Sequence, residues 1–474
     1  MTLEKSLTAK IRSVFLLIKQ SFSSENLDLT AIPIRRSVFL LAIPMMFEMV
    51  MESVFALVDL YFVGHLKESA FAIQTVGLTE SLLTIVYSIS IGISMAATAI
   101  IARRIGEKNP IKASESASQA ILLSILITIL LSVFGFIYSK DLLIWMGSSE
   151  EAAEYGKNFT KIMMVSCLSI VLLFLINGIF RGAGNAAIAM KSLWLANGIN
   201  IILCPILVRG WFFFPEMGLE GAALSTAIGR SCGVVYQLYY LKKKDSLIQI
   251  KWSYFVPKSN LIINILRIAI PAIVQYVIAS CSWIILARIV AQTGGEIASS
   301  GYQTALRLMM FFMLPAWGLS NAAATLVGQN LGNRDPEKAE KSVLMTMKFN
   351  IIYMLIISIV FYGLSNYLVS IFTTEESIKL VAKEGMYILA SGFLLYGIGM
   401  VMMNAFNGAG DTMTPTIINF VGFWLFQIPL AYILSYHFDL REEGVFIAIP
   451  VAETFIAILA FILFKRGKWK LKIV

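Results

Sequence analysis

Runs of about 20 apolar residues recur along nearly the whole chain, and they restrict it to one class of fold. A helix of that length crosses the hydrocarbon core of a bilayer and satisfies its own backbone hydrogen bonds there. Hydrophobic residues make up 58% of the 474 residues and charged residues 14%, against about 25% charged in ordinary soluble domains. The sequence therefore predicts an all-α polytopic membrane protein without a soluble domain of useful size.

Twelve such runs are predicted to be membrane spans, with boundaries soft by a few residues. They cover residues 37–63, 71–101, 117–138, 159–180, 187–208, 219–241, 265–290, 300–327, 344–371, 384–407, 413–436 and 444–465. Connections rich in Lys and Arg alternate with poorer ones, which by the positive-inside rule places both termini in the cytoplasm. This distribution explains the net charge of +9 as topology, without a nucleic-acid partner.

The second half of the chain repeats the first at a shift of about 226 residues. The shift aligns IGISMAAT with WGLSNAAA, superposing Gly92 on Gly318, and aligns IFRGAGN with AFNGAGD. Six spans in each half is an even number, so the halves should be parallel repeats related by an axis along the membrane normal. We expect two six-helix lobes around a central cavity, with small residues such as Gly92 and Gly182 packing helices closely inside each lobe.

This organisation predicts five segments. They are a cytoplasmic N-terminal segment (1–36), an N-lobe (37–241), a cytoplasmic linker (242–264), a C-lobe (265–465) and a cytoplasmic basic tail (466–474).

The first span contains three carboxylates, Glu48, Glu52 and Asp59. Their spacings of four and seven residues place them on one face of a helix. A charge near the bilayer centre costs at least about 2.5 to 3.5 kcal/mol, so this face should meet protein or water rather than lipid.

The repeat argues that these acids serve function rather than fold. Aligning AIP at 42–44 with AIP at 269–271 puts Gln275, Ala279 and Leu286 opposite the three acids. A requirement of the shared scaffold should appear in both halves, and the second half has none of the carboxylates. Such acids in a partly dry cavity can hold a proton and release it when a cation arrives, which would give obligate exchange.

Several motifs resemble the multidrug and toxic compound extrusion (MATE) family over nearly the whole chain after the N-terminal segment. They are VDLYFVGHL, IARRIGEKNP and the pair FRGAGN and FNGAGD. The resemblance is to the DinF-like branch, because spans seven and ten lack interior carboxylates. It implies a twelve-helix antiporter that exports organic cations and other amphipathic compounds by alternating access, driven by protons or sodium.

The resemblance also implies roles for individual residues. Asp59 matches the first-span aspartate of the family, Pro44 matches the proline where that helix bends, and Glu52 matches a polar position two turns before the aspartate. Asn200 and Thr226 match polar positions of spans five and six.

One departure affects the choice of coupling ion. Cys204 stands where the branch often has an aspartate, and a thiol is a poor ligand for sodium, which prefers hard oxygen donors. We therefore expect proton coupling, and keep as the alternative a sodium ion held by Asp59, Glu52, Asn200 and Thr226. No other cofactor is expected.

The remaining intramembrane polar and thioether residues are candidates for a substrate cavity. They are Gln275, Arg230, Glu453, Cys204 and Met51. Arg230 and Glu453 lie at equivalent depths when Gly221 is aligned with Gly444, and either a charge pair or separate roles would fit. Arg181, in FRGAGN, is expected to anchor a cytoplasmic turn.

Two other functions are alternatives to a multidrug exporter. A lipid-intermediate flippase of the related superfamily would need phosphate-binding cations in the cavity, for which only Arg230 is positioned. An intramembrane enzyme would need a motif such as HExxH or GxSxG, and the chain has neither. The sequence therefore favours a secondary transporter, expected as a monomer whose partners are lipophilic small molecules and the bilayer.

Overall fold

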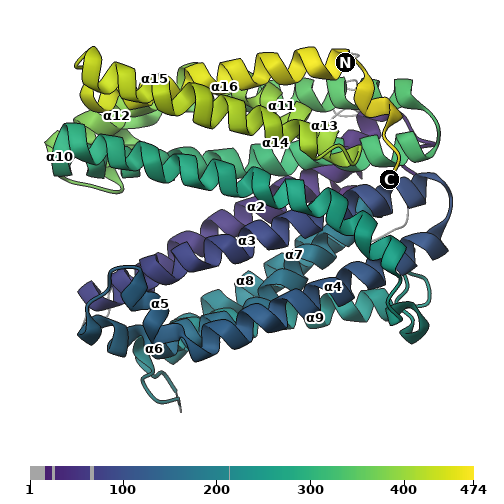
Figure 1. Cartoon of the computed structure of the whole chain (residues 1–474), viewed down its shortest axis with the longest axis horizontal. Coiled ribbons are helices and arrows are strands. Elements are labelled where there is room, and N and C mark those ends of the chain that lie inside the picture. The colour runs from purple at the N-terminus through teal and green to yellow at the C-terminus, as the bar shows by residue number, and fades with distance from the viewer. Residues whose placement is uncertain (1–15, 24–26, 65–68, 213) are drawn as a thin grey trace, which may run out of the picture.

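The computed structural model describes residues 16–23, 27–64, 69–212 and 214–474. The described residues form helices joined by short connections, without strands. In Figure 1 the N-lobe helices occupy the lower half of the molecule and the C-lobe helices the upper half, with their axes roughly along one direction.

The N-lobe contains eight helices. They are α2 (Ile34–Gly64), α3 (Ser69–Gly106), α4 (Pro110–Ile137), α5 (Ser139–Trp145), α6 (Glu150–Val165), α7 (Cys167–Gly182), α8 (Ala186–Arg209) and α9 (Gly218–Lys242). Together α6 and α7 make one crossing that is interrupted at Ser166. A 3₁₀ turn, η1 (Trp252–Phe255), lies in the connection to the C-lobe.

The C-lobe begins with α10, which consists of two arms. Its elements are α10 (Ser259–Gly332), α11 (Pro336–Ser370), α12 (Glu376–Ser391), α13 (Phe393–Gly408), α14 (Met413–Asn419), the π-helix η2 (Phe420–Gln427), α15 (Ile428–Tyr432), the π-helix η3 (Ile433–His437), α16 (Arg441–Lys465) and the 3₁₀ turn η4 (Lys468–Leu471). Gly295 divides α10 with φ 70° and ψ −158°, a conformation that only glycine adopts readily.

The twelve predicted crossings are confirmed. Within the described ranges, nine helices are long and apolar enough to span a membrane, and the pair α12 and α13, bent by 57°, makes a tenth. The two arms of α10 are separate crossings, and the more polar α9 supplies the last.

The internal repeat appears as repeated contacts. Trp194 Nε1 donates to the Phe47 carbonyl in the N-lobe (2.9 Å), and Trp424 Nε1 donates to the Ile278 carbonyl in the C-lobe (3.1 Å). Each bond ties the fifth span of a lobe to its first, so the two lobes share one packing scheme.

Helix starts repeat in the same way. Asn109 accepts from the backbone N–H of Lys112 at the start of α4, and Asp335 accepts from that of Lys338 at the start of α11. A proline occupies the first turn in both cases, as expected where a backbone N–H has no helical partner.

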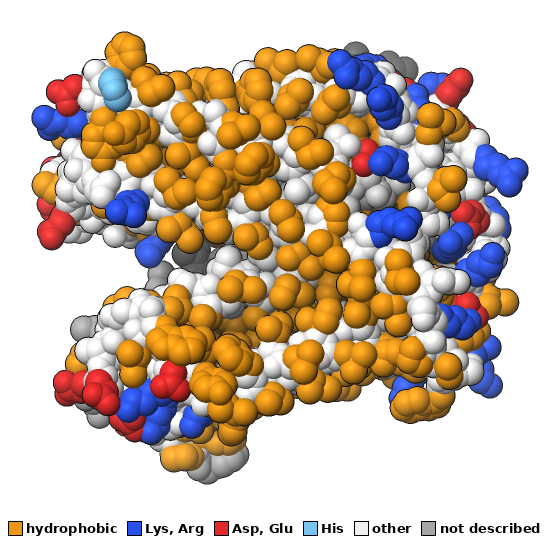
Figure 2. All heavy atoms as spheres, in the orientation of Figure 1, with side chains coloured by type: hydrophobic (Ala, Val, Ile, Leu, Met, Phe, Trp, Pro, Cys, Tyr) orange, Lys and Arg blue, Asp and Glu red, His pale blue; other side chains and the backbone are white. Residues whose placement is uncertain are grey.

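The lobes touch at one end and separate at the other. Figure 2 shows a hollow between them at the end that carries the connections 138–149 and 371–375, which we call the open end. Lys and Arg gather at the opposite end, called here the basic end, which carries the connections 107–109, 243–258 and 333–335. The structure is therefore closed at the basic end.

Glycines make the closed contact between α3 and α10. A Cβ on Gly106 would lie 2.0 Å from the carbonyl oxygen of Gln329, and one on Gly332 would lie 2.2 Å from that of Arg103. Because these distances are far below van der Waals contact, only glycine allows the two backbones to approach this closely.

The expected role of the shared small residues is confirmed for one glycine and corrected for another. Gly182 packs against Thr98 of its own lobe, as predicted. Gly92 instead faces Ile273 of α10, so it lies between the lobes, and its repeat partner Gly318 faces the Met45 carbonyl of α2. Equivalent positions of two repeats meet near their pseudo-symmetry axis. A sequence alignment does not show where that axis lies, so it did not show that Gly92 faces the other lobe.

The basic tail also joins the lobes. Trp469 is fully buried and stacks on Phe464 of α16. The guanidinium group of Arg103 donates to the Lys472 carbonyl, and Lys472 Nζ lies 3.0 Å from Asp411 Oδ1. The tail therefore bridges α3 of the N-lobe and the α13–α14 turn of the C-lobe.

Candidate functional site

The first-span acids lie on α2, which runs without interruption through the buried Pro44. Glu48 and Glu52 are one turn apart and both face the other N-lobe helices. The backbone of Asp59 belongs to α2, but its side chain lies outside the described part of the structure.

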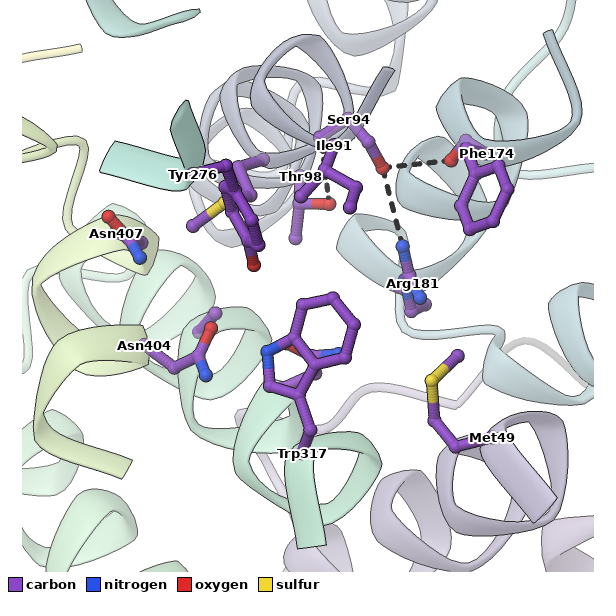
Figure 3. A pocket seen from close by; sticks show the side chains of 13 residues that line it. Met49, Ile91, Ser94, Thr98, Phe174, Arg181, Tyr276, Trp317, Asn404 and Asn407 are labelled. Atoms are coloured by element: carbon purple, nitrogen blue, oxygen red, sulfur yellow. Dashed lines mark hydrogen bonds between the residues drawn. The ribbon is translucent and has the colours of Figure 1, made fainter. Parts of the chain in front are cut away.

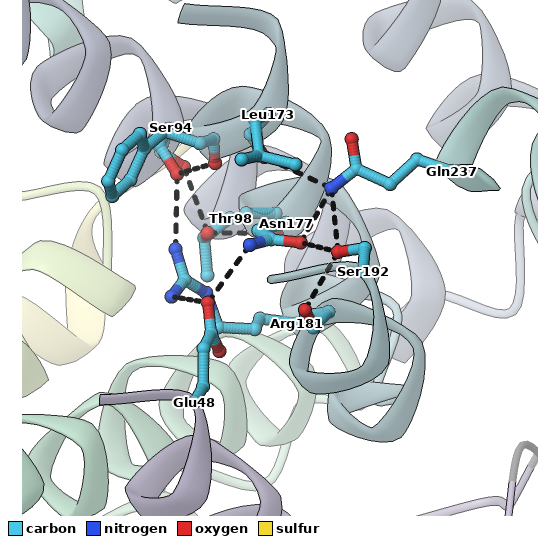
Figure 4. Close-up of polar contacts among 11 residues, drawn as sticks. Glu48, Ser94, Thr98, Leu173, Asn177, Arg181, Ser192 and Gln237 are labelled. Carbon is cyan, nitrogen blue, oxygen red and sulfur yellow. Dashed lines mark hydrogen bonds and ion pairs between the residues drawn. The ribbon is translucent and has the colours of Figure 1, made fainter. Parts of the chain in front are cut away.

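Glu48 is buried in a polar network (Figure 4). Its side chain is 1% exposed, and its Oε1 accepts from Asn177 Nδ2 (3.0 Å) and lies 3.3 Å from Arg181 Nη1. Asn177 in turn accepts from Ser192 (2.8 Å) and Gln237 (2.6 Å). The network joins α2 to α7, α8 and α9, and the guanidinium group compensates the carboxylate, as a buried charge requires.

This contact corrects the expectation for Arg181. The side chain does not anchor a turn at the basic end, but points between the lobes, where its Nη2 also donates to Ser94 Oγ (3.3 Å). Arg181 lies one turn after Asn177 on α7, so both side chains reach the same carboxylate from one helix face.

Glu52 forms a second ion pair with a buried arginine. Its Oε1 accepts from Arg230 Nη2 and its Oε2 from Asn197 Nδ2, both at 3.0 Å. The Arg230 side chain is 2% exposed, and its guanidinium carbon lies 5.3 Å from the Phe55 ring centre and 5.5 Å from that of Phe174. Glu52 remains 21% exposed, so this pair has one dry and one accessible member.

The pair decides between the two arrangements left open for Arg230 and Glu453. Arg230 is bound to Glu52 of its own lobe, whereas Glu453 borders a cavity of the C-lobe. The two residues therefore lie in separate surroundings and do not form a charge pair with each other.

Asn200 and Thr226 lie together next to this pair. Asn200 Nδ2 donates to Thr226 Oγ1 (2.8 Å), while its buried Oδ1 has no hydrogen-bond partner among the described residues. Asn200 is one turn beyond Asn197 on α8, and Thr226 is one turn before Arg230 on α9. In the described ranges no three side chains from His, Cys, Asp and Glu form a metal-binding group.

Two of the residues predicted to line a substrate cavity, Cys204 and Met51, do not border the two cavities described below. Cys204 is fully buried in a hydrophobic cluster with Val208 and Leu219, and its place in a substrate cavity stays a prediction. Met51 is half-buried, and its carbonyl lies 3.5 Å from Asn197 Nδ2, so it contacts the Glu52 site through its backbone.

A small cavity of about 40 Å³ lies between the lobes (Figure 3). Arg181 and Thr98 border it from the N-lobe, and Trp317, Asn404 and Asn407 from the C-lobe. Arg181 and Asn407 occupy the same position of the repeated motifs FRGAGN and FNGAGD. The difference between the two motifs at this position was the signal in the sequence that this arginine differs from the shared turn, and the turn interpretation missed it.

The C-lobe contains a larger cavity of about 340 Å³. Two predicted cavity residues, Gln275 of α10 and Glu453 of α16, both border it. Glu453 is 4% exposed, and its Oε1 has no hydrogen-bond partner in the described chain. The rest of the wall is mainly aromatic and thioether, from Tyr276, Trp283, Trp317, Tyr396, Phe423, Met310, Met313, Met400 and Met403.

A single family model, MatE, matches residues 44–206 and again residues 271–433. The chain belongs to the MatE family. The double match coincides with the repeat, and residues of both matched segments form the two lobes.

Individual MatE proteins resemble the chain along almost its full length. A probable multidrug resistance protein NorM of Thermotoga maritima is 27% identical over 92% of this chain and 93% of its own. A probable multidrug resistance protein YoeA of Bacillus subtilis is 25% identical over 92% and 94%. A solved outward-facing multidrug resistance MATE transporter, 24% identical, matches 95% of this chain and 99% of its own with a TM-score of 0.89, which shows the shared fold. The chain is thus a multi-pass membrane transporter of the MATE multidrug efflux family, not an enzyme.

Proposed function

We propose that this MatE protein is a secondary exporter that exchanges amphipathic organic cations from the cytoplasm for external protons. It acts as a monomer in the cytoplasmic membrane, with both termini and the basic end in the cytoplasm. The lobes 37–241 and 265–465 rock about the central cavity, and Pro44 provides a point where α2 can bend. The hollow at the open end then faces outward, where the exporter releases its cargo.

The exposure of the Glu52 pair supports a proton-coupling role. A proton from outside can reach Glu52, which is 21% exposed, while Arg230 stays buried between two aromatic rings. Protonation removes the negative partner of a desolvated guanidinium, and such an uncompensated charge is costly enough to drive a rearrangement of α2 against α9. Asp59, two turns further along the same face of α2, shares in this proton transfer.

The same pair makes sodium coupling at Glu52 less favourable than proton coupling. Two positive charges about 4 Å apart repel one another by about 4 kcal/mol at an effective dielectric constant of about 20. A sodium ion on Glu52 would meet the guanidinium of Arg230 at such a distance. The unpartnered Oδ1 of Asn200 is the observation that keeps a sodium site with Asp59 and Thr226 as the alternative.

The flippase alternative gains no support from the two intramembrane arginines near the cavity. Arg181 is paired with Glu48 and Arg230 with Glu52, so a lipid phosphate would have to displace a carboxylate from either one.

Transport in liposomes tests the proposal. Export of the fluorescent cation ethidium is compared under an imposed pH gradient and under a sodium gradient, for the natural chain, Asp59→Asn and Glu52→Gln. The exposed Glu443→Gln is the matched control. We expect the pH gradient alone to drive transport and both N-lobe variants to lose at least about tenfold in rate.

Transport driven by sodium alone would instead support the site of Asp59, Asn200 and Thr226. If neither gradient drives export, the antiport mechanism itself is wrong.

A further inference from the structure

We propose that the cavity of the C-lobe is the binding site for the organic cation, with the carboxylate of Glu453 as its counter-ion. This assignment rests on the proposed function and makes it more specific, because it separates the residues that bind the cargo from the N-lobe acids that carry the proton.

The internal repeat carries the first step of the argument. Aligning Gly221 with Gly444 places Arg230 at the position of Glu453, and the AIP alignment places Glu52 at the position of Ala279. In the N-lobe these two positions hold an ion pair with a 3.0 Å contact.

In the C-lobe the same two positions hold an acid and a methyl group, Glu453 and Ala279, and both border the cavity. The C-lobe thus has a charge of opposite sign at the Arg230 position, and no charged side chain at the Glu52 position to pair with it. A ligand that brings a positive charge would complete the pair.

The surroundings of Glu453 carry the second step. No Lys or Arg is among the residues that border the cavity, and Glu453 Oε1 has no hydrogen-bond partner in the described ranges. An isolated carboxylate in a dry site is unfavourable unless it is neutralised, so the site favours entry of a cation. The described acids of α2, by contrast, already have partners in Arg181 and Arg230.

The walls carry the third step, because they define the chemical class of the cation. Trp283, Trp317 and Tyr396 border the cavity, and aromatic rings bind cations with delocalised charge. Four methionines also border the cavity, together with several amide side chains, and methionines adapt to ligands of different shapes. A volume of about 340 Å³ lies at the lower end of the range for drug-sized ligands, so the site fits one multi-ring monocation.

Calorimetric titration of the purified full-length chain tests the site without any ion gradient. Tetraphenylphosphonium is the cationic probe, and triphenylphosphine oxide is an uncharged probe with similar rings. We expect Glu453→Gln to weaken phosphonium binding by about tenfold or more and to leave binding of the phosphine oxide within about twofold. Glu443→Gln, which removes an exposed acid of the same helix, should bind both probes normally.

A second variant supplies the missing partner. Ala279→Arg places a guanidinium group at the position that Glu52 occupies in the N-lobe. The new guanidinium should pair with Glu453 and so abolish phosphonium binding, although Glu453 is still present. This variant tests the site even if Glu453→Gln does not fold.

Normal phosphonium binding in both variants would overturn the proposal, as would loss of binding in Glu52→Gln alone. Failure of the proton-exchange proposal would appear separately, as transport that ignores the pH gradient while Glu453→Gln still binds phosphonium weakly.

Discussion

At the scale of single residues, the pair of Glu52 and Arg230 predicts a stability cycle. Glu52→Gln leaves a buried guanidinium without its carboxylate, and we expect it to destabilise the protein by about 3 kcal/mol. The double variant Glu52→Gln, Arg230→Met should recover most of that loss, since it removes both charges. Thermal unfolding in detergent, followed by tryptophan fluorescence, measures the difference.

The cycle has a clear opposite outcome. If the double variant is no more stable than Glu52→Gln alone, the guanidinium is held by its aromatic neighbours Phe55 and Phe174 rather than by the acid.

The sequence predicted where these acids lie but not what binds them. The four-residue spacing placed Glu48 and Glu52 on one helix face, and both side chains do face the other N-lobe helices. Their partners Arg181 and Arg230 lie 133 and 178 residues away along the chain. Such pairs depend on how α7 and α9 pack against α2, and no local pattern contains that information.

At the scale of helices, the contact of α3 with α10 predicts an effect of a single methyl group. Gly106→Ala would bring a Cβ to 2.0 Å from the Gln329 carbonyl, so the backbones must move apart at the basic end. Overpacking of this kind costs about 1 to 3 kcal/mol, which shifts the population toward the state open at the basic end by about fivefold to 150-fold. Spin-label distances across the two ends of the molecule report this shift.

Gly77→Ala is the matched control, because it lies on the same helix and a Cβ there would meet no atom within 4 Å. Equal distance distributions for the two variants would mean that the glycine contact does not hold the basic end closed.

Helices were predictable where local chemistry determines them. The motifs GEKNP and GNRDP contain the capping side chain and the proline that start α4 and α11. The π-helix at Phe420–Gln427 and the bend between α12 and α13 were not predictable, because packing across the lobe determines them. At the bend, for example, a Cβ on Gly392 would lie 2.4 Å from Pro450 of α16, so the break depends on a helix far along the chain.

At the scale of the whole molecule, the repeat predicts how the open end closes. Glu80 on α3 and Arg307 on α10 occupy nearly equivalent positions of the two repeats, both are exposed, and they lie within electrostatic range of one another. When the lobes close at this end, we expect the two side chains to form an ion pair. Glu80→Arg should then slow transport severalfold, and the exchange Glu80→Arg with Arg307→Glu should restore it.

Rates of ethidium export in liposomes provide the measurement, with Glu443→Arg, at the exposed start of α16, as a control for the same change in net charge. A charge exchange that is as slow as the single variant would contradict the ion pair.

The twelve crossings and two lobes were predictable from the sequence because hydropathy and the repeat are global patterns. The conformation was not, because hydropathy and the repeat are the same whether the lobes meet at the basic end or at the open end.

The glycine contact at the basic end also bears on electrical insulation. A proton gradient stores energy across the membrane. A protein with acids and arginines through its middle would dissipate that energy if protons could pass along them. Where Gly106 and Gly332 meet, peptide groups lie directly against each other, without side chains to admit a file of water molecules. The resting protein should therefore conduct no current, and protons should cross only when a lobe carries them.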